Sequence, residues 1–460
     1  MINWQGKNVL IIGAARQGQA LARYLAGKNC HVILNDNRTP DEFGEVVANL
    51  VDLGVEWVLG DHPLALLDRV DVVCLSGGIP LSLPIVKTAV KRGLPLTNDS
   101  QIFMDSVKAP VIGITGSAGK TTTTTLVGKI AQKAVQGHTK TWVGGNIGLP
   151  LVEYLEEINP QDIVILELSS FQLEQMTTSP AIAVVLNITP NHLDRHITMD
   201  AYTAAKSRIL QFQSRQDIAV LNREDQGSWS LKQQVKGSLV SFGLQRPKNG
   251  GTATFVENDS IYLQQDGEVV KVMPVSDVQL RGKHNLLNVL AAIVISAATD
   301  FSIEAMVSAI KQFSGVEHRL EFVRKINGIS WVNDSIATAP ERTMAALDSF
   351  DEPLVLLLGG RDKNLPWGEL STRIHQRVKQ VIVFGEAAAK ITAAIGKPQP
   401  GDVLQQVLNT DAMSDALAKA VNVAKPGDVV LLSPGCTSYD AFLDFEERGN
   451  YFKKWVTELA

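Results

Sequence analysis

The stretch ITGSAGKTTTTT, residues 114–125, limits the folds open to this chain because of what stands on either side of it. The preceding residues, PVIGITG, form an apolar run that is typical of a buried parallel strand. The threonines after the loop are expected to lead into a helix through Ala134. A strand, a glycine-containing loop and a helix in this order are the setting that a phosphate-binding loop requires. We therefore predict an α/β domain built around this loop.

The loop departs from the usual phosphate-loop pattern, G-x-x-x-x-G-K-[ST], because Ile114 stands where the first glycine is expected. Gly116 and Gly119 fit a shorter form, T-G-x-x-G-K-[ST]. These glycines would let backbone N–H groups turn toward phosphate, next to the N-terminus of the helix. Lys120 would reach the β- and γ-phosphates, and the Thr121 hydroxyl would bind Mg²⁺. The alternative, a turn that contains a lysine by chance, does not explain the strand and the helix around it.

Composition excludes some classes of function. A length of 460 residues suggests about three domains, at roughly 150 residues each. Hydrophobic residues at 45% and charged residues at 20% are ordinary for a globular protein in solution. The net charge of −5 leaves no basic surplus for neutralising a phosphate backbone, which argues against a nucleic-acid partner.

The cysteines and the apolar runs indicate the compartment. Cys30, Cys74 and Cys436 are far apart in the sequence and fit neither a disulfide framework nor a zinc site, so a reducing cytoplasm is expected. The polar start, MINWQGKN, does not have the pattern of a signal peptide. The longest apolar run, residues 289–298, is too short to cross a membrane.

The N-terminal block reads as a Rossmann-like βαβ unit. A strand, NVLIIG, is followed by the loop GAARQG, a helix to about Lys28 and a second strand, HVILND. Asp36 ends that strand, where a dinucleotide fold places its ribose-binding carboxylate. Ala15, however, replaces the glycine that lets the backbone approach a pyrophosphate. A βαβ unit with or without a nucleotide site therefore fits this block, and DVVCLSGGIP adds another strand with a glycine turn.

The central block carries further candidate residues. Glu167 ends the strand DIVILELSS, a position suited to a Mg²⁺ contact. His192 lies in the loop after a later strand, and a lone loop histidine is more often structural than a ligand. Lys206 lies in a predicted helix whose pattern marks it only as a solvated lysine. Asn285 and Asn288 interrupt an apolar helix as packing caps or as ligand contacts, and spacing does not choose between them.

Two regions frame the rest of the chain. Residues 236–274 form short strands with turns at 258–259 and 266–267, which predicts a small β excursion. From about Val316 the strands ISWVND, PLVLLLGG, QVIVFG and DVVLLSPG alternate with helical patterns, which predicts a third doubly wound sheet. The polar loops NDSIAT, GGRDKN and SPGCTSYD would line one edge of it as a small-molecule site.

We therefore predict an α/β protein of three domains, each with a mostly parallel sheet. Residues 1–98 form a Rossmann-like domain, residues 99–315 a central phosphate-loop domain with the β excursion, and residues 316–460 a second Rossmann-like domain.

Motifs along the whole chain resemble those of the Mur ligases. They are, in order, TGSAGKTT, GGNIG, LELSSFQLE, NITPNHLDRH, AAKSRIL, KHNLLNVLAA, EHRLE, NDSIAT, GGRDKN and LSPGCTSYDAFLDFEERG. The central motifs are shared with folylpolyglutamate synthase, which the extra N-terminal domain disfavours. The last three motifs resemble those of the branch that adds D-glutamate to UDP-N-acetylmuramoyl-L-alanine, and the C-terminal, serine-rich motif is the more specific.

The resemblance implies an ATP-dependent, amide-bond-forming ligase of peptidoglycan precursor synthesis, and hence a role in cell-wall biogenesis, cell shape and cell division. Its substrates would be UDP-N-acetylmuramoyl-L-alanine, D-glutamate and ATP. The γ-phosphoryl group would first be transferred to the substrate carboxylate, and the D-glutamate amine would then displace phosphate from the acyl phosphate. We expect a cytoplasmic monomer with no nucleic-acid or membrane partner.

The resemblance also implies roles for residues at matching positions. Those expected to be catalytic are Lys120, Glu167, His192 and Lys206. Those expected to bind ATP are Gly116, Ser117, Ala118, Gly119, Lys120, Thr121, Thr122, Asn285, Asn288, Arg319 and Asp334. Two Mg²⁺ ions would be held by Thr121, Glu167, His192 and Lys206, the lysine as a carbamate formed with CO₂. The UDP-substrate would meet Arg16, Gln17, Asp36, Asn37, Arg38, Gly78, Asn146 and His192. D-Glutamate would meet Thr338, Lys363, Ser438, Tyr439 and Phe445.

Three positions depart from the family pattern. Ile336 stands where several relatives carry lysine in NDS-x-AT, so a cation there is lost or moved. Arg16 and Gln17 replace small or hydroxyl residues in the first glycine loop, which leaves the uridine contacts of that loop open.

Two rival functions come from other classes. A nicotinamide-dependent dehydrogenase would use the N-terminal block, but Ala15 and the complete Gly-Lys-Thr loop argue against it. A regulatory NTPase without ligase activity would leave the polar loops of the third block unexplained.

Overall fold

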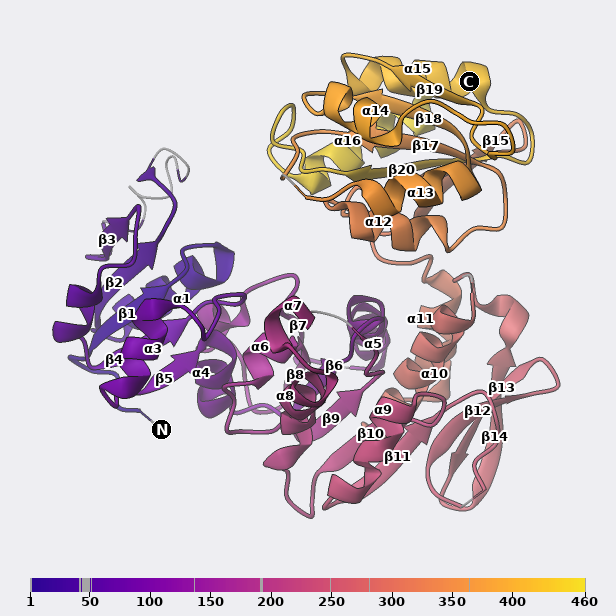
Figure 1. Cartoon of the computed structure of the whole chain (residues 1–460). Coiled ribbons are helices and arrows are strands. Elements are labelled where there is room, and N and C mark those ends of the chain that lie inside the picture. The colour runs from indigo at the N-terminus through magenta and orange to yellow at the C-terminus, as the bar shows by residue number, and fades with distance from the viewer. Residues whose placement is uncertain are drawn as a thin grey trace. The chain divides into compact units, whose positions relative to one another are not determined.

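The computed structural model describes residues 2–40, 43, 50, 52–135, 137–190, 193–248, 250–280, 282–363 and 365–459. His192 lies outside these residues. The chain divides into two compact units, residues 1–313 and 314–460, and each is described by itself. The first unit contains two sheets and the second unit contains one (Figure 1).

The N-terminal sheet has five parallel strands in the order β3-β2-β1-β4-β5. The strands are β1 (Asn8–Ile12), β2 (His31–Asp36), β3 (Glu56–Leu59), β4 (Val72–Leu75) and β5 (Leu96–Asn98). Val9 and Ile11 pack in a core with α1 (Arg16–Gly27) and α4 (Asp99–Ser106). Leu10 and Ile12 pack in a second core with η2 (Leu64–Asp68) and α3 (Pro84–Lys91). Because both faces are covered, the strand reads as a continuous apolar run.

The central sheet has nine strands in the order β14-β13-β12-β11-β10-β9-β6-β8-β7. They are β6 (Val111–Thr115), β7 (Thr141–Gly145), β8 (Ile163–Glu167), β9 (Ile182–Val185), β10 (Ile218–Asn222), β11 (Ser238–Phe242), β12 (Ala253–Glu257), β13 (Ser260–Gln265) and β14 (Glu268–Pro274). Neighbouring strands from β7 to β12 are parallel, so β6, β8 and β9 end at the same edge of the sheet.

The helices of this domain pack around the parallel strands. They are α5 (Lys120–Ala134), α6 (Ser170–Leu173), α7 (Leu193–His196), α8 (Met199–Gln211), α9 (Gln226–Ser230), α10 (Lys283–Ala297) and α11 (Ile303–Gln312), with the short turns η3 (Leu151–Tyr154), η4 (Leu231–Gln234) and η5 (Val275–Asp277). Helices α10 and α11 pack on α5, whereas Tyr202, Ile209 and Leu210 of α8 join a core with alternate residues of β6, β8 and β9.

The β excursion is confirmed as an antiparallel extension of this sheet, β12–β13–β14. Both of its two-residue turns have positive φ angles at their central positions, 46° and 53° at Asn258 and Asp259 and 52° and 85° at Asp266 and Gly267. Short polar residues and glycine tolerate this left-handed conformation, which matches the twist of paired strands. The turn residues therefore specify both hairpins.

The sheet of the second unit has the order β15-β16-β20-β17-β18-β19 and is parallel except at the β15 edge. Its strands are β15 (Glu321–Ile326), β16 (Ile329–Asn333), β17 (Leu354–Gly359), β18 (Val378–Phe384), β19 (Gln406–Asn409) and β20 (Val429–Gly435). Its helices are α12 (Pro340–Leu347), α13 (Gly368–Arg377), α14 (Ala388–Ile395), α15 (Met413–Val423) and α16 (Phe445–Glu458).

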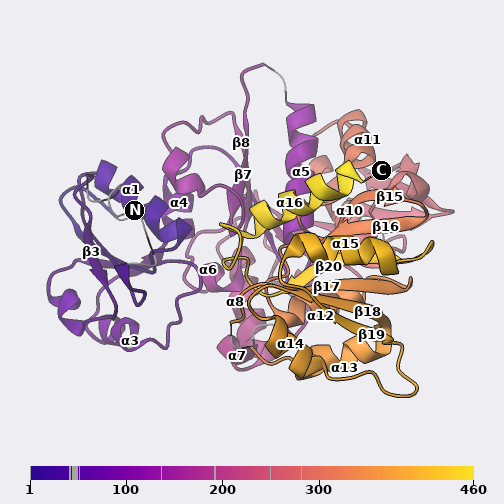
Figure 2. The ribbon, with the colours of Figure 1, turned by 90° about the horizontal axis from the view of Figure 1, so that it is seen from above.

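Helices cover both faces of that sheet. Leu354, Leu356 and Leu358 of β17 pack in a core with α12, α13 and α14, while Val355 and Leu357 pack in another with α15 and α16. Figure 1 shows α12 and α13 on one side of the strands and α15 on the other. Figure 2 looks onto the face covered by α15 and α16. The prediction of an α/β fold with three domains, each with a mostly parallel sheet, is confirmed.

Two further features of the structure concern the cysteines and the length of the helices. Cys30, Cys74 and Cys436 are all free thiols. Among the residues that the structure describes, no helix is long and apolar enough to cross a membrane.

Candidate functional site

The phosphate loop joins the end of β6 to the start of α5. Gly119 precedes the helix in a left-handed conformation, with φ of 82°. A Cβ atom there would lie 2.3 Å from Oδ1 of Asn288 on α10, so only glycine fits. The first N–H groups of the 15-residue helix have no partner within the helix, and Gly119 has no side chain to cap them. These N–H groups and the helix dipole suit the helix end to an anion.

Lys120 lies across this loop. Its Nζ donates hydrogen bonds to the carbonyl oxygens of Gly116, at 2.8 Å, and Ser117, at 3.4 Å. The ammonium therefore stands over the same backbone that would surround a phosphate.

Thr121 and Glu167 meet directly below the loop. The Thr121 hydroxyl donates to Oε2 of Glu167 at 2.9 Å, and Nδ2 of Asn146 donates to Oε1 at 2.9 Å. Glu167 is only 1% exposed, and in the described part of the chain no ion pair joins it to a lysine, arginine or histidine. A buried carboxylate held only by neutral donors is costly without a cation nearby.

These donors fit Mg²⁺. A hydroxyl and a carboxylate are the hard oxygen ligands that the ion prefers, and Mg²⁺ usually takes one or two protein groups together with phosphate oxygens and water. Thr121 and Glu167 would hold it. The ion would supply positive charge beside the phosphates.

Lys206 is not the solvated lysine that its helical pattern alone predicts. It is 1% exposed, and its Nζ donates to the Gly116 carbonyl at 2.9 Å and contacts Thr115 Oγ1 at 3.4 Å. The amine also lies 4.7 Å from the centre of the Tyr202 ring. Burial, reinforced by the charge of Lys120, holds the pKa of Lys206 well below its ordinary value, although Glu167 opposes the shift. The resemblance, rather than the pattern, located this residue at the site.

Asn288 of α10 also reaches the phosphate loop. Asn288 is buried and touches Gly119 as described, and its Nδ2 donates to Asn285 Oδ1 at 3.2 Å. Of the residues expected to bind ATP, those of the loop and of α10 are brought together in the first unit. Arg319 and Asp334 belong to the second unit.

In the N-terminal domain, Asp36 organises the first glycine loop. Its Oδ2 accepts a hydrogen bond from Ala14 N at 2.7 Å, and both oxygens accept from the Arg38 guanidinium. Burial raises the pKa of Asp36, but the hydrogen bonds from Arg38 and Ala14 outweigh burial and leave that pKa at about 2. Asp36 is therefore a charged anchor whose oxygens already have partners, while Arg16 and Asn37 are exposed beside it.

Several polar contacts connect this domain to the central one, and besides the ion pairs Arg23–Glu153 and Lys28–Glu156 two of them lie close to candidate site residues. Gln17 Nε2 donates to Gly145 O at 2.6 Å, next to Asn146. Arg195 of α7 donates to the Gly78 carbonyl at 2.7 Å, and its guanidinium lies over the Phe171 ring. Sequence reasoning missed Arg195, which no spacing rule distinguishes from a surface arginine.

In the second unit, the three polar loops meet at the carboxyl edge of the sheet, as predicted. Lys363 Nζ lies 3.5 Å from Thr338 Oγ1, and the backbones of Arg361 and Thr437 form a two-way bridge. Ser438 is buried in the loop after β20, and Tyr439 is 61% exposed.

Arg448 of α16 fixes two of these loops from inside. It is fully buried, and its guanidinium donates to Ser335 Oγ, at 3.0 Å, and to the carbonyls of Ser335 and Cys436. Ser335 Oγ in turn donates to the carbonyl of Phe445 at 2.8 Å. Sequence reasoning also missed Arg448, because nothing in the run FEERG distinguishes a buried arginine from a solvated one.

Ile336 stands where several relatives carry lysine, but an arginine lies close to it. Arg342 of α12 donates to the Ile336 carbonyl at 3.3 Å, and its charge helps to lower the pKa of Lys363, after burial as the main cause. A cation thus lies beside this motif, supplied by the following helix.

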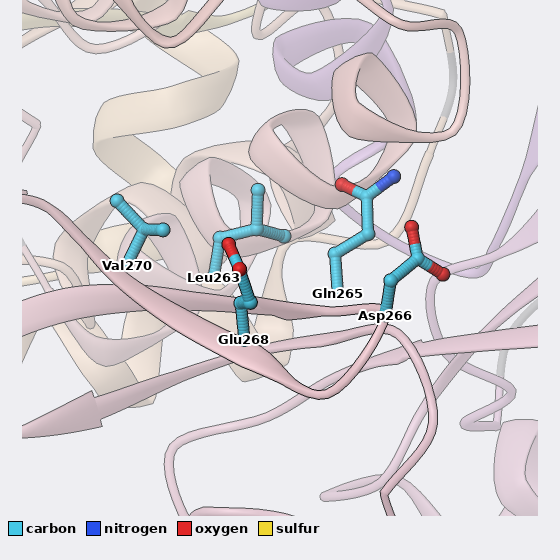
Figure 3. Close-up of a pocket in the computed structure, with 5 residues that line it drawn as sticks. All are labelled: Leu263, Gln265, Asp266, Glu268 and Val270. Atoms are coloured by element: carbon cyan, nitrogen blue, oxygen red, sulfur yellow. The ribbon is translucent and has the colours of Figure 1, made fainter.

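A hollow of about 260 Å³ lies elsewhere, on the β13–β14 hairpin (Figure 3). It is lined by Leu263, Gln265, Asp266, Glu268 and Val270. None of these residues belongs to the sites above, and the acidic pair Asp266 and Glu268 is exposed, so this hollow does not fit an anionic substrate.

Comparison with known proteins decides the family. A profile of the Mur ligase MurD-like N-terminal domain matches residues 7–98, the Mur ligase middle domain matches 114–296, and the Mur ligase glutamate ligase domain matches 318–436. The UDP-N-acetylmuramoylalanine–D-glutamate ligase of Symbiobacterium thermophilum is 40% identical over 450 residues, 98% of each chain. That of Pelotomaculum thermopropionicum is 39% identical over 454 residues, again 98% of each chain.

The chain belongs to the Mur ligase family.

Solved structures agree with the fold of a Mur ligase. The UDP-N-acetylmuramate-alanine ligase MurC of Thermotoga maritima superimposes with a TM-score of 0.57 at 18% identity, covering 98% of this chain and 99% of its own. MurF of Acinetobacter baumannii gives a TM-score of 0.57 at 19% identity, over 91% of this chain and 88% of its own. At such identities the likeness extends to the fold of this Mur ligase alone.

Asp334 makes the folding stability of this Mur ligase depend on pH. It is buried at the end of β16, and it accepts hydrogen bonds from Ser433 Oγ, at 2.8 Å, and Leu320 N, at 3.2 Å. Burial outweighs these bonds and raises the pKa of Asp334 to about 7. An unfolded aspartate ionises near pH 4, at about 3.9. The folded chain therefore holds a proton that the unfolded chain releases, and stability falls as pH rises from about 4 to about 7.

We predict that Asp334→Asn raises the melting temperature at about pH 8 and has little effect at about pH 4.5, where the carboxyl is already neutral. Circular dichroism melts at both pH values measure this. Asp351→Asn, at an exposed position of the same unit, is the control and should show no such difference. A variant less stable than the parent at the higher pH would contradict the prediction.

Proposed function

We propose that this Mur ligase joins D-glutamate to UDP-N-acetylmuramoyl-L-alanine at the expense of ATP. The observation that carries the proposal is the buried pair of Thr121 and Glu167 below an intact phosphate loop, in a chain 40% identical to a ligase named for that reaction. The proposed product is a peptidoglycan precursor.

The chemistry follows from the weakness of a carboxylate as an electrophile. Transfer of the γ-phosphoryl group of ATP to the carboxylate oxygen of the L-alanyl end gives an acyl phosphate and ADP. The D-glutamate amine attacks the acyl carbon, the C–O bond to phosphate breaks, and the amine loses a proton. Lys120 and the first N–H groups of α5 bind the phosphates and oppose the negative charge that moves between them. Mg²⁺ on Thr121 and Glu167 would add positive charge at the same place.

Each substrate is assigned to a domain. In the N-terminal domain Arg16, Gln17, Asp36, Asn37, Arg38 and Gly78 are proposed to bind the UDP moiety, with Asn146 and His192 facing the muramoyl group. Gln17 and Asp36 would act mainly by shaping this site, because their side chains already bond to Gly145 O and to Arg38. Asn285, Asn288, Arg319 and Asp334 are proposed to hold the adenine nucleotide. In the third domain Thr338, Lys363, Ser438, Tyr439 and Phe445 would bind D-glutamate.

We propose that Lys206 becomes a carbamate that helps to hold a second Mg²⁺ with His192. The neutral amine would attack CO₂ and lose one proton, giving an anion with two oxygens. Its support is the position of Lys206: a buried side chain that reaches under the phosphate loop, at Gly116. We also propose that the chain works as a monomer in the cytoplasm, in keeping with its three free thiols.

The first test is substrate-dependent phosphate release. With UDP-N-acetylmuramoyl-L-alanine and ATP present, D-glutamate should release phosphate, whereas L-glutamate and L-alanine should not. Lys120→Ala should release none, because it lacks the cation over the phosphates. Release that does not depend on any amino acid would favour an NTPase and contradict the proposal.

The second test concerns the D-glutamate pocket. Lys363→Ala should raise KM for D-glutamate by about one to two powers of ten, since a charge-assisted hydrogen bond contributes about 1.5–3 kcal/mol. KM for ATP should change little. Lys397→Ala, at another exposed lysine of the same domain, should change neither constant. Equal losses for both substrates would mean that Lys363 does not determine amino-acid specificity.

The third test separates the carbamate from a plain lysine. Lys206→Ala should lose nearly all activity and regain part of it with acetate, whose carboxylate can occupy the vacated ligand position. Lys206→Arg keeps the charge but cannot be carbamylated, so it should be as inactive as the alanine variant. Carbon-13 NMR of the parent in labelled bicarbonate should show one carbamate signal that both variants lack. An active arginine variant would instead mean that Lys206 acts through its hydrogen bond to the Gly116 carbonyl.

A further inference from the structure

Asn187 holds the apex of the phosphate loop from outside. It lies two residues after the end of β9. Its side chain forms hydrogen bonds with both the N–H and the carbonyl of one loop residue, Ala118. Ala118 N donates to Asn187 Oδ1 at 2.8 Å, and Asn187 Nδ2 donates to Ala118 O at 3.0 Å. The backbone of Asn187 adds a third bond, because its carbonyl accepts from Ser117 N at 3.0 Å.

The neighbouring loop residue is held in the same way. Ser117 Oγ donates to Thr189 O at 2.9 Å and accepts from Thr189 N at 3.0 Å. Tyr202 of α8 also donates to Ser117 Oγ at 3.0 Å. Residues between the two glycines of the loop are thus bound to the segment after β9 rather than to one another.

We propose that Asn187 is a positioning residue for nucleotide binding, which sets the direction of the loop N–H groups before phosphate arrives. A short loop that begins on Ile114 and Thr115 lacks the first glycine of the longer pattern, and Ala118 is exposed. Without Asn187, the residue before the left-handed Gly119 would have to be ordered at the moment of binding, which costs affinity. The inference rests on the proposed function only in taking the loop to bind nucleotide.

The bonds also indicate which N–H groups remain for phosphate. Because Asn187 takes the N–H groups of Ser117 and Ala118, the N–H groups of Gly119 and of the first turn of α5, beside the Lys120 ammonium, remain available to phosphate. Asn187 therefore selects the anion-binding N–H groups as well as steadying the loop.

The chain offers a matched control in Asn222, at the end of the next strand, β10. Its Nδ2 donates to Leu186 O at 2.8 Å and its Oδ1 accepts from Glu224 N at 2.9 Å. Asn222 thus makes the same kinds of bond as Asn187, and one of them goes to Leu186, the residue before Asn187. Neither of these bonds goes to the phosphate loop.

The experiment measures ADP binding by isothermal titration calorimetry on the full chain, with melting temperatures taken without nucleotide. Asn187→Ala should weaken ADP binding about tenfold or more, the order expected for two lost hydrogen bonds at a half-buried position. KM for ATP should rise in parallel, while KM for D-glutamate stays near that of the parent. Asn222→Ala should lower the melting temperature at least as much as Asn187→Ala does. Its affinity for ADP should stay that of the parent.

Asn187→Leu preserves side-chain volume and should reproduce the loss of ADP affinity even where the alanine variant is too unstable to assay. ADP affinity unchanged in the leucine variant would overturn the inference, as would a loss of equal size in Asn222→Ala. Because ADP binding needs no turnover, a parent that binds ADP but shows no D-glutamate-dependent phosphate release would refute the proposed reaction and leave the inference about Asn187 standing.

Discussion

The central site depends on a buried carboxylate, Glu167, to which the described residues offer no ion-pair partner. Its two oxygens accept hydrogen bonds from the neutral donors of Thr121 and Asn146. Such an arrangement would be a poor way to stabilise a fold. It is intelligible if this is the place proposed above for a divalent cation beside the phosphates. The glycines around it serve the same end: a Cβ on Gly145 would lie 2.3 Å from the Glu167 carbonyl.

Much of the fold could be predicted from the sequence because its strands are buried on both faces. NVLIIG, PVIGITG and PLVLLLGG are continuous apolar runs, and each is a central strand. The helix after the phosphate loop ends at Ala134, as expected. Strands at or near the sheet edges were missed: β3, β7, β15 and β19 are short or half-exposed. Their patterns are diluted by polar residues, and only pairing with a neighbour makes them strands.

The candidate site was predictable to a different degree in its parts. Lys120, Thr121 and Glu167 follow from position, because strand ends and helix starts are where parallel sheets gather ligands. Lys206 needed the resemblance, since a helix pattern does not reveal that one lysine faces the core. Asn187, Arg195 and Arg448 act through bonds to backbone carbonyls and N–H groups far away in sequence. Such bonds leave no periodic signal, so the packed structure is needed to find them.

Arg448 also has a consequence for the order of folding. Its guanidinium binds Ser335, a residue 113 positions earlier in the chain, and thereby closes most of the third domain into one loop. Closure over such a distance is entropically expensive and comes after local contacts have formed. Pairing of β16 with β20 spans almost the same distance, from Ser330 to Val429, so the helices and the local strand contacts can form before either closure is made. In a refolding experiment, helical signal from this domain would precede the native arrangement of the loops NDSIAT and SPGCTSYD, which Arg448 holds together.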